Sequence, residues 1–418
     1  MSLLRRHILH FGATTLAGLP LSLRAAPEQP TRKLVVVMLR GAVDGLSVVA
    51  PYGDAHYAAS RPQLALKAPG TADDALLKLD NLFGLHPALA PLHRHFEGGQ
   101  LAFVHASGSP DPTRSHFDAQ DYFESGTPGR KSTPDGWMNR LLTALPGEPS
   151  PTRAISQGNT PPRIFAGPAS VASLGLGREA TQRRAIDEPR MQGALAKLYE
   201  GDAQLAGTYR ETVEGRREMS RSMASAERQN MARMGDPTAD AGAPSARSFA
   251  ADAKRLGQLI QHDPHTQLAF TAVGGWDTHV NQGAAQGQLA NKLAALGQGL
   301  AALADGLGDS LRDTVIVVAS EFGRTVRQNG TGGTDHGRGN VMWLLGGPVA
   351  GGKVLGEWPG LDTAALADGR DLAVVTDFRQ VLAPVLQRHL GLSEAGLAAV
   401  LPGLPAGSAL LARQLLRA

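Results

Sequence analysis

The chain has 418 residues, of which 42 % are hydrophobic and 19 % are charged, and it contains 50 glycines, 27 prolines and no cysteine. This composition is that of a globular protein, and the lack of cysteine excludes disulfides, thiolate catalysis and a cysteine-based zinc site. Residues 1–26 carry arginines but no acid, so the rest of the chain has 38 basic and 38 acidic residues, a balance that favours neither nucleic acid nor anionic membranes as partners.

The N-terminus has the order of an export signal. Arg5 and Arg6 precede a modestly apolar run, and the small residues Ala25 and Ala26 follow it. The arginine pair resembles a twin-arginine signal. Glycines and a proline interrupt the run, which is too short and too weakly apolar for a membrane anchor. We therefore expect export to the periplasm or the medium, with residues 1–26 as the signal and no integral membrane association.

Continuous apolar runs, the pattern of strands buried on both faces, recur along the chain. They cover residues 33–39, 101–105, 267–273, 314–319 and 341–345, with a shorter run at 372–375. Helical patterns lie between them, at 86–96, 116–124, 284–304 and 378–389. This alternation predicts an α/β fold with a mostly parallel sheet sandwiched by helices.

Two stretches depart from the alternation. Residues 132–175 are rich in Pro, Ser and Gly, which predicts loop or irregular structure. Residues 189–261 are helical in pattern with crowded Glu and Arg, which indicates a helical insertion that packs on the sheet or caps the site, or else a solvated arm. The expected organisation is a signal at 1–26 and one α/β domain at 30–418, with the insertion at about 189–261.

Polar segments lie beside five of the predicted strands, and ligands of open parallel sheets bind beyond the carboxyl ends of the strands. In chain order, the candidate residues in these segments are Asp44, Ser115, Asp277, His279, Glu321, Arg324, Asp335, His336 and Arg338. Each also has a plainer interpretation. Asp44 could cap a turn, Asp277 and His279 could be solvated loop residues, and Ser115 with Asp118 forms a helix N-cap pattern.

The joint placement of these residues predicts a metal site. Four carboxylates at one rim would repel one another without a cation, and two histidines add the nitrogen ligands that zinc prefers. We expect one or two divalent ions, with zinc first and Mn, Ca or Mg as alternatives. The expected ligands are Asp44, Asp277, His279, Glu321, Asp335 and His336.

The same segments offer catalytic groups. Ser115 would lie at a helix N-terminus, where the backbone dipole and a nearby cation favour an alkoxide nucleophile, and Thr113 is the reserve nucleophile. Arg324 and Arg338, with Arg114 as a third candidate, could hold a tetrahedral oxyanion through paired N–H groups.

Several motifs resemble one known family. The twin-arginine start and the segments RGAVDGL, RSHFDAQDYFESG, GWDTH, SEFGRT and GTDHGRG are similar to the bacterial domain of unknown function 1501 over nearly the whole mature chain. That family is regarded as a distant relative of sulfatases and alkaline phosphatases. The resemblance implies an alkaline-phosphatase-like sandwich with Asp44 and Glu321 on one metal and Ser115 as the bridging nucleophile. It places Asp277, His279 and His336 on the other metal.

The chain departs from the superfamily pattern in three places. Glu321 is followed by Phe322 where alkaline phosphatases have an Asp-His pair, and Asp277 and His279 are closer together than is usual. The segment before Ser115 lacks the Cys or Ser of a sulfatase modification motif, which argues against a formylglycine sulfatase. One metal ion is therefore an alternative to two.

The function expected from these residues is an exported metal-dependent hydrolase of phosphate or sulfate esters, acting on a small or polymeric anionic ester. Two readings from other classes stay open. One is a catalytically silent, metal-stabilised scaffold with a protein partner, and the other is a binding protein for an anionic polymer or glycan.

Overall fold

The first apolar run forms strand β1 (Lys33–Leu39), and every residue of this strand is buried. The computed structural model describes residues 31–158, 161–177, 188–223 and 239–417, so the expected signal at 1–26 lies outside the described residues. Alternate residues of β1 pack into two different apolar clusters, because successive strand side chains point to opposite faces. Val35, Val37 and Leu39 enter one cluster, whereas Leu34, Val36 and Met38 enter the other.

β1 lies near the middle of a nine-stranded sheet with the order β11-β5-β10-β9-β1-β8-β6-β7, and β12 pairs with β5. The strands are β5 (Leu101–Gly108), β6 (Ala154–Gln157), β7 (Ala172–Leu174), β8 (Leu268–Val273), β9 (Thr314–Ser320), β10 (Asn340–Leu345), β11 (Lys353–Leu355) and β12 (Thr376–Asp377). All pairings are parallel except those of β10, which runs antiparallel to β5 and β9. The expected mostly parallel sheet is confirmed.

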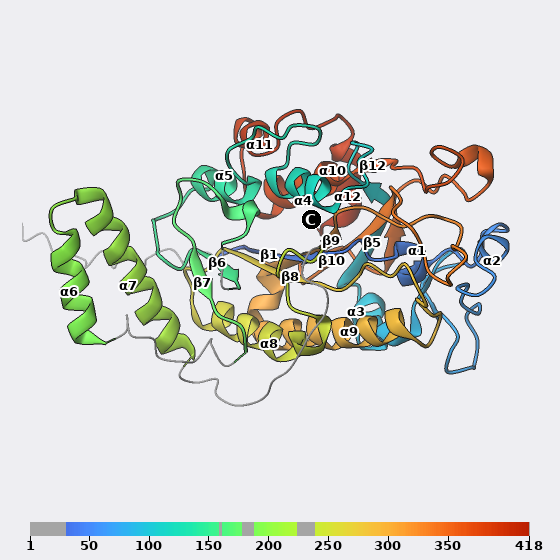
Figure 1. Cartoon of the computed structure of the whole chain (residues 1–418), viewed down its shortest axis with the longest axis horizontal. Helices are drawn as coiled ribbons and strands as arrows, with labels where there is room; N and C mark the ends of the chain where they lie inside the picture. The colour runs from blue at the N-terminus through green and yellow to red at the C-terminus, as the bar shows by residue number, and fades with distance from the viewer. Residues whose placement is uncertain (1–30, 159–160, 178–187, 224–238, 418) are drawn as a thin grey trace, which may run out of the picture. The chain divides into compact units, whose positions relative to one another are not determined.

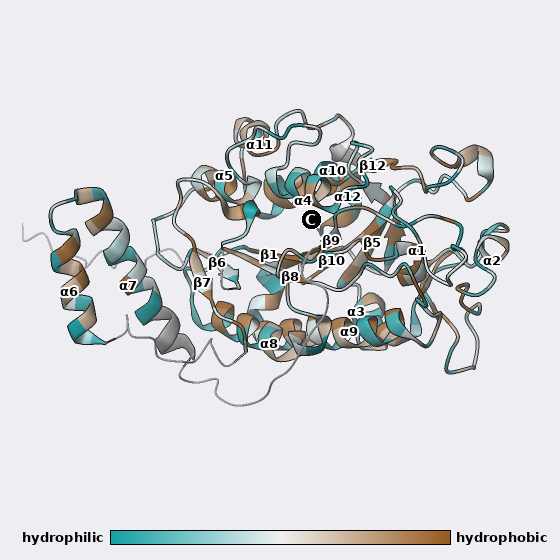
Figure 2. Ribbon diagram, in the orientation of Figure 1, coloured by the Kyte–Doolittle hydropathy of each residue, from teal (hydrophilic) through white to brown (hydrophobic). Residues whose placement is uncertain are grey.

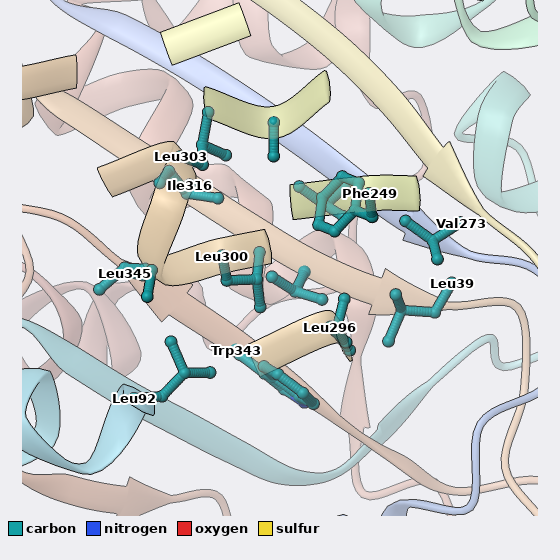
Figure 3. Close-up of a cluster of buried hydrophobic side chains, with 14 of the residues drawn as sticks. Leu39, Leu92, Phe249, Val273, Leu296, Leu300, Leu303, Ile316, Trp343 and Leu345 are labelled. Carbon is teal, nitrogen blue, oxygen red and sulfur yellow. The ribbon is translucent and has the colours of Figure 1, made fainter. Parts of the chain in front are cut away.

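Helices cover both faces of this sheet (Figure 1). One layer contains η1 (Pro87–Leu89), α3 (Ala90–Glu97), α8 (Ala246–His262), α9 (Gln288–Leu307) and η5 (Gly308–Asp313). The opposite layer contains α4 (His116–Ser125), α5 (Trp137–Ala144), α10 (Phe378–Pro384), η7 (Val385–His389), α11 (Glu394–Val400) and α12 (Ser408–Leu415). Figure 3 shows the first cluster, in which Leu296 and Leu300 of α9 and Phe249 of α8 pack over Trp343 and Ile316 of the sheet.

The colouring in Figure 2 follows this layering: hydrophobic residues lie along the central strands, and α8 and α9 mix hydrophobic and hydrophilic residues. Burying a large aliphatic or aromatic side chain contributes roughly 1.5–3 kcal/mol, so the two clusters provide the main stabilisation of the sandwich. No helix in the described part of the chain is long and apolar enough to cross a membrane.

The shorter elements lie in the connections. A small three-stranded sheet has the order β2-β4-β3, from β2 (Val49–Ala50), β3 (Leu77–Lys78) and β4 (Gly84–Leu85). The short helices are α1 (Gly45–Val48), α2 (Tyr57–Ser60), η2 (Arg163–Phe165) and η6 (Thr363–Ala365).

The helical stretch at 189–261 contains α6 (Pro189–Tyr199), α7 (Ala203–Met223) and α8. α8 buries Phe249, Leu256 and Ile260 in the first apolar cluster, whereas α6 buries no residue. α8 therefore belongs to the helical layer of the sandwich. The prediction of a helical insertion is then limited to α6 and α7. The domain boundaries themselves stay a prediction.

Two sequence expectations differ from the structure. Residues 372–375 form no strand, because their backbone makes isolated hydrogen bonds instead of a continuous ladder. Examples are Gly339 N–H to Leu372 O and Val375 N–H to Ala106 O. The stretch 132–175 is not all loop, since it contains α5, β6, η2 and β7. β6 and β7 are only four and three residues long, too short for a clear apolar run.

Candidate metal centre

The predicted polar segments meet at one edge of the sheet. β1, β5, β8 and β9 are parallel to one another, so the segments that follow them emerge at the same edge. β10 is antiparallel, and for that reason the segment that precedes it reaches the same edge. This geometry explains why His336 lies before its strand while Asp277 and Glu321 lie after theirs.

Four ligand-type atoms converge at this edge. His336 Nε2 lies 3.1 Å from His116 Nε2, 3.0 Å from His279 Nε2 and 3.2 Å from Asp277 Oδ1. Asp277 Oδ1 lies 3.7 Å from His116 Nε2 and 3.0 Å from His279 Nε2. Zinc–nitrogen bonds of 2.0–2.1 Å at tetrahedral angles place ligand atoms about 3.3 Å apart. The ligand atoms of His116, Asp277 and His336 all lie within 4.8 Å of one another, and His279 adds a fourth beside Asp277 and His336. We call these four residues the His3Asp cluster.

The other ring nitrogen of each histidine faces an acceptor. His116 Nδ1 lies 2.8 Å from Glu321 Oε1, and His279 Nδ1 lies 3.2 Å from Asp335 Oδ1. His336 Nδ1 donates to the carbonyl oxygen of Arg114 at 2.9 Å. These acceptors place the proton of a neutral ring on Nδ1, so the Nε2 lone pairs of His116 and His279 each face that of His336 and lie near the Asp277 carboxylate oxygen. Such an arrangement repels itself unless a cation lies between the groups, and the residues therefore fit a divalent metal ion.

The charges around the cluster also favour a cation. Burial acts to lower the pKa of His116, but hydrogen bonds to Asp277 and Glu321 outweigh it and raise the pKa to about 9. Burial acts to raise the pKa of Asp277, but His116, His336 and the guanidinium of Arg324 hold it well below its usual range. Side-chain exposures of 31 % for Asp277 and 39 % for His279 leave the cluster accessible from solvent.

The turn after β1 packs closely against the backbone next to the His3Asp cluster. Gly41 has φ +109°, and a Cβ atom there would lie 2.9 Å from the backbone nitrogens of Trp276 and Asp277, so only glycine fits. Gly41 N–H donates to Glu321 Oε1 at 2.8 Å. Glu321, which is 2 % exposed, also accepts from Gln120 Nε2 at 3.0 Å. Glu321 thus holds both the β1 turn and the His116 ring.

Asp277, His279 and His336 come together as the sequence predicts, but Glu321 and Asp335 take a different place from the expected one. Both carboxylates face Nδ1 atoms, where they orient His116 and His279 rather than add oxygen atoms to the cluster. A hydrogen bond from Asn329, together with His279, holds the pKa of Asp335 below its usual value. Carboxylates in this position fix the ring orientation and increase the basicity of the coordinating nitrogen.

Asp44 does not reach the cluster, contrary to its prediction as a metal ligand. It is fully buried and pairs with Arg61, whose Nη atoms lie 2.5 and 3.0 Å from its two oxygens. Ser47 and Gln282 donate further hydrogen bonds to the same carboxylate. Burial acts to raise the pKa of Asp44, but the charge and hydrogen bonds of Arg61 outweigh this and lower it.

Asp44 is nevertheless linked through Gln282 to the two loops that carry Asp277, His279 and His336. Gln282 Oε1 accepts from Thr278 at 2.8 Å and from Thr334 at 2.9 Å. Thr278 lies between two cluster residues, and Thr334 precedes the segment that contains His336. Asp44 therefore helps to position two loops without contributing an oxygen atom to the cluster.

The catalytic candidates also differ in their contacts. Arg324 is 1 % exposed and donates to the carbonyls of Gly41, Ala42, Trp276 and Thr334 and to Asp277 Oδ1, so it is not available to a substrate. Arg114 pairs with Asp371 and Asp368. Within the described residues, the Arg338 side chain makes one hydrogen bond, to the Pro110 carbonyl at 3.4 Å, and its Nε is buried without a partner.

Ser115 is the N-cap of α4, where its Oγ accepts from Asp118 N–H. This capping role is compatible with a second, catalytic one, because the residue directly precedes His116.

His116 is the residue of the His3Asp cluster that the sequence analysis does not name as a candidate ligand. It is the first residue of α4, directly after the N-cap Ser115. In the motif RSH, the serine and the arginine are named as candidates in the sequence analysis, and the histidine is not. The first residue after an N-cap points back over the helix N-terminus, and this is the local signal that could have identified it.

Comparison with known proteins identifies a family. The family described as "Protein of unknown function (DUF1501)" matches residues 31–402. No curated protein matches the chain.

Among solved structures, the chain is similar to the C-terminal periplasmic domain of EcEptC from Escherichia coli, with 13 % identity over 91 % of this chain and 89 % of that chain and a TM-score of 0.40. It is similar to Ps i-CgsB in complex with k-i-k-neocarrahexaose, with 12 % identity, coverage of 88 % and 74 % and a TM-score of 0.42. A third is the PsFucS1 sulfatase from Pseudoalteromonas sp., with 11 % identity, coverage of 87 % and 68 % and a TM-score of 0.36.

Proposed function

The chain belongs to the DUF1501 family, and we propose that it is an exported, metal-dependent hydrolase of phosphate or sulfate esters. The observation that carries the proposal is the His3Asp cluster, whose three Nε2 atoms and one carboxylate oxygen converge at the carboxyl edge of the sheet. His116, Asp277, His279 and His336 would hold one divalent ion, zinc first by ligand type.

A bound divalent ion would supply Lewis-acid chemistry, polarising an ester oxygen and lowering the pKa of an adjacent hydroxyl group. The chain supplies the other parts. Glu321 and Asp335 hold the histidine rings in one orientation, and Arg324 holds Asp277 at 2.5 Å. Ser115 provides a hydroxyl at the positive end of the α4 dipole, and Arg338 provides a cation for a phosphate or sulfate group. With Asp44 paired to Arg61, the residues support one metal rather than two.

Ser115→Ala is expected to abolish ester hydrolysis while metal content and fold persist, because the nucleophilic hydroxyl would be lost. A role as helix cap alone would instead cost about 0.5–2 kcal/mol of unfolding free energy and leave the activity of the folded protein intact. Turnover of a panel of phosphate and sulfate esters, measured beside thermal unfolding, separates the two roles.

Thr113→Ala is the control for a misassigned nucleophile, since in the described part of the chain Thr113 Oγ1 makes one hydrogen bond, which it accepts from the Ser115 N–H. A metal-loaded wild-type protein that hydrolyses no ester in the panel would favour the scaffold reading.

Export rests on the residues before the described part of the chain. Arg5 and Arg6 before an apolar run support a twin-arginine signal, a route that carries proteins already folded and suits loading of a metal before export. We expect N-terminal sequencing of the exported protein to begin shortly after Ala26. A chain that stays in the cytoplasm with its arginine pair intact would contradict export.

A further inference from the structure

A cavity of about 260 Å³ lies at the edge of the sheet opposite the His3Asp cluster. Four arginines line it, namely Arg32, Arg312, Arg388 and Arg417, and Asp313 is its one acidic lining residue. Arg32 precedes β1 and Arg312 precedes β9, so the cavity is at the amino ends of these parallel strands. We call it the arginine cavity.

The arginine cavity is separate from the candidate metal centre. β1 has seven residues between the two edges, and at 3.3 Å per residue it spans roughly 20 Å. A small ligand cannot contact both places. Any binding at the arginine cavity therefore does not depend on the proposed hydrolase function.

Backbone carbonyls hold three of the four guanidinium groups in place. Arg32 Nη1 donates to the carbonyls of Arg388 and His389 at 2.9 and 3.0 Å. Arg388 Nη1 donates to Ala412 O at 2.6 Å, and Arg417 donates to Val349 O and Gly99 O at 3.0 and 2.7 Å. Arg32 and Arg388 each use one nitrogen in these bonds and Arg417 uses two, and the remaining N–H groups have no partner within the described residues. Anchored arginines with spare donors are preorganised for an oxyanion.

The charge of the arginine cavity is not balanced locally. Arg312 forms an ion pair with Asp313 at 3.2 Å, whereas Arg32, Arg388 and Arg417 have no carboxylate partner in the described part of the chain. The chain beyond residue 26 carries equal numbers of basic and acidic residues, so this concentration of positive charge is local. Four guanidinium charges against one carboxylate leave an excess that suits a doubly charged ligand better than a singly charged one.

We propose that the arginine cavity binds a doubly charged tetrahedral oxyanion, a phosphate or sulfate group, either as the free ion or as a monoester. Arg32, Arg388 and Arg417 supply the anchored donors, and Arg312 adds a fourth guanidinium. Pro348 and Leu416 supply apolar lining. The planar guanidinium fork matches two oxygens of such a group at once.

Calorimetric titration of the full-length mature protein with sodium phosphate and with sodium sulfate, at constant ionic strength in chloride, tests the site. We expect saturable binding of both ions and much weaker binding of acetate. Arg312→Gln and Arg388→Gln should each weaken binding by about tenfold, the size expected for one charge-assisted hydrogen bond. Arg94→Gln is the matched control, because Arg94 is an exposed arginine paired with Asp305 elsewhere on the surface, and it should bind as the wild type does.

His336→Gln, which is expected to lose the metal, separates this site from the candidate metal centre: phosphate binding that remains in this variant is assigned to the arginine cavity, and adding Arg388→Gln should weaken it. Glucose 6-phosphate as a second probe distinguishes the source of the group: affinity equal to that of phosphate includes monoesters, and a large loss restricts the cavity to the free ion. Absence of saturable binding, acetate binding as tight as that of phosphate, or binding lost in His336→Gln but kept in both cavity variants would overturn the proposal.

Discussion

Replacing His336 by glutamine is expected to lower the zinc affinity of the protein by a hundredfold or more, on the order of the loss of one of four ligands. Among the residues of the His3Asp cluster, His336 is expected to affect zinc affinity most, because its Nε2 atom lies next to His116 and His279 as well as Asp277 Oδ1. Glutamine keeps a polar side chain of similar length but offers no imidazole nitrogen. Ester hydrolysis should fall together with the metal content, since the bound ion would be required for hydrolysis.

Glu321→Gln is the matched comparison for this variant. Glu321 faces His116 Nδ1 and not the centre of the cluster, so its loss should weaken zinc binding by about 10–100-fold, the range for a residue that orients a ligand. Competition with a chromophoric chelator measures both affinities, and circular dichroism checks the fold. If His336→Gln bound zinc as tightly as the wild type, the His3Asp cluster would not be the metal site.

Replacing Asp44 by alanine is expected to lower the free energy of unfolding by about 3–5 kcal/mol, the cost of leaving a buried charge without its partner. Asp44 and Arg61 are both 0 % exposed, and Arg61 has no other carboxylate in contact among the described residues. Gln282 and Ser47 also lose their acceptor. The folded variant should still bind one zinc ion, because no bond of Asp44 reaches the cluster.

Urea unfolding at neutral pH measures the loss of stability in Asp44→Ala, and elemental analysis of the folded fraction measures its metal. Asp44→Ala combined with Arg61→Met removes both charges and should recover part of the stability, because no unpaired charge then stays buried. A variant that keeps full stability but loses all bound metal would restore Asp44 as a ligand.

Much of the fold could be predicted from the sequence because its strands are buried on both faces. A strand such as β1 then reads as one unbroken apolar run, KLVVVML, with the same limits in sequence and structure. Parallel strands also bring the residues that follow them to one edge, so Asp277, His279 and His336 could be grouped without coordinates. β6 and β7 give no such signal because they are short and lie within a region rich in proline and glycine.

The roles of individual polar residues could not be read in the same way. Asp44 and Arg61 are 17 positions apart, and no local pattern indicates that they form a buried ion pair. Glu321 and Asp335 lie at the expected edge, but whether a carboxylate faces the metal or the far nitrogen of a histidine depends on side-chain direction. Arg324 looked available for an oxyanion, yet four backbone carbonyls and Asp277 take up its donors.

The metal content of the purified mature protein tests the central claim most directly. After incubation with zinc and removal of the excess, elemental analysis should find about one zinc ion per chain, as expected for a single four-ligand site. Treatment with a strong chelator should remove the ion and lower the unfolding temperature, because an ion that binds only the folded state stabilises it. Protein that retains no zinc, manganese, calcium or magnesium, and whose unfolding temperature does not respond to chelator, would contradict the metal centre.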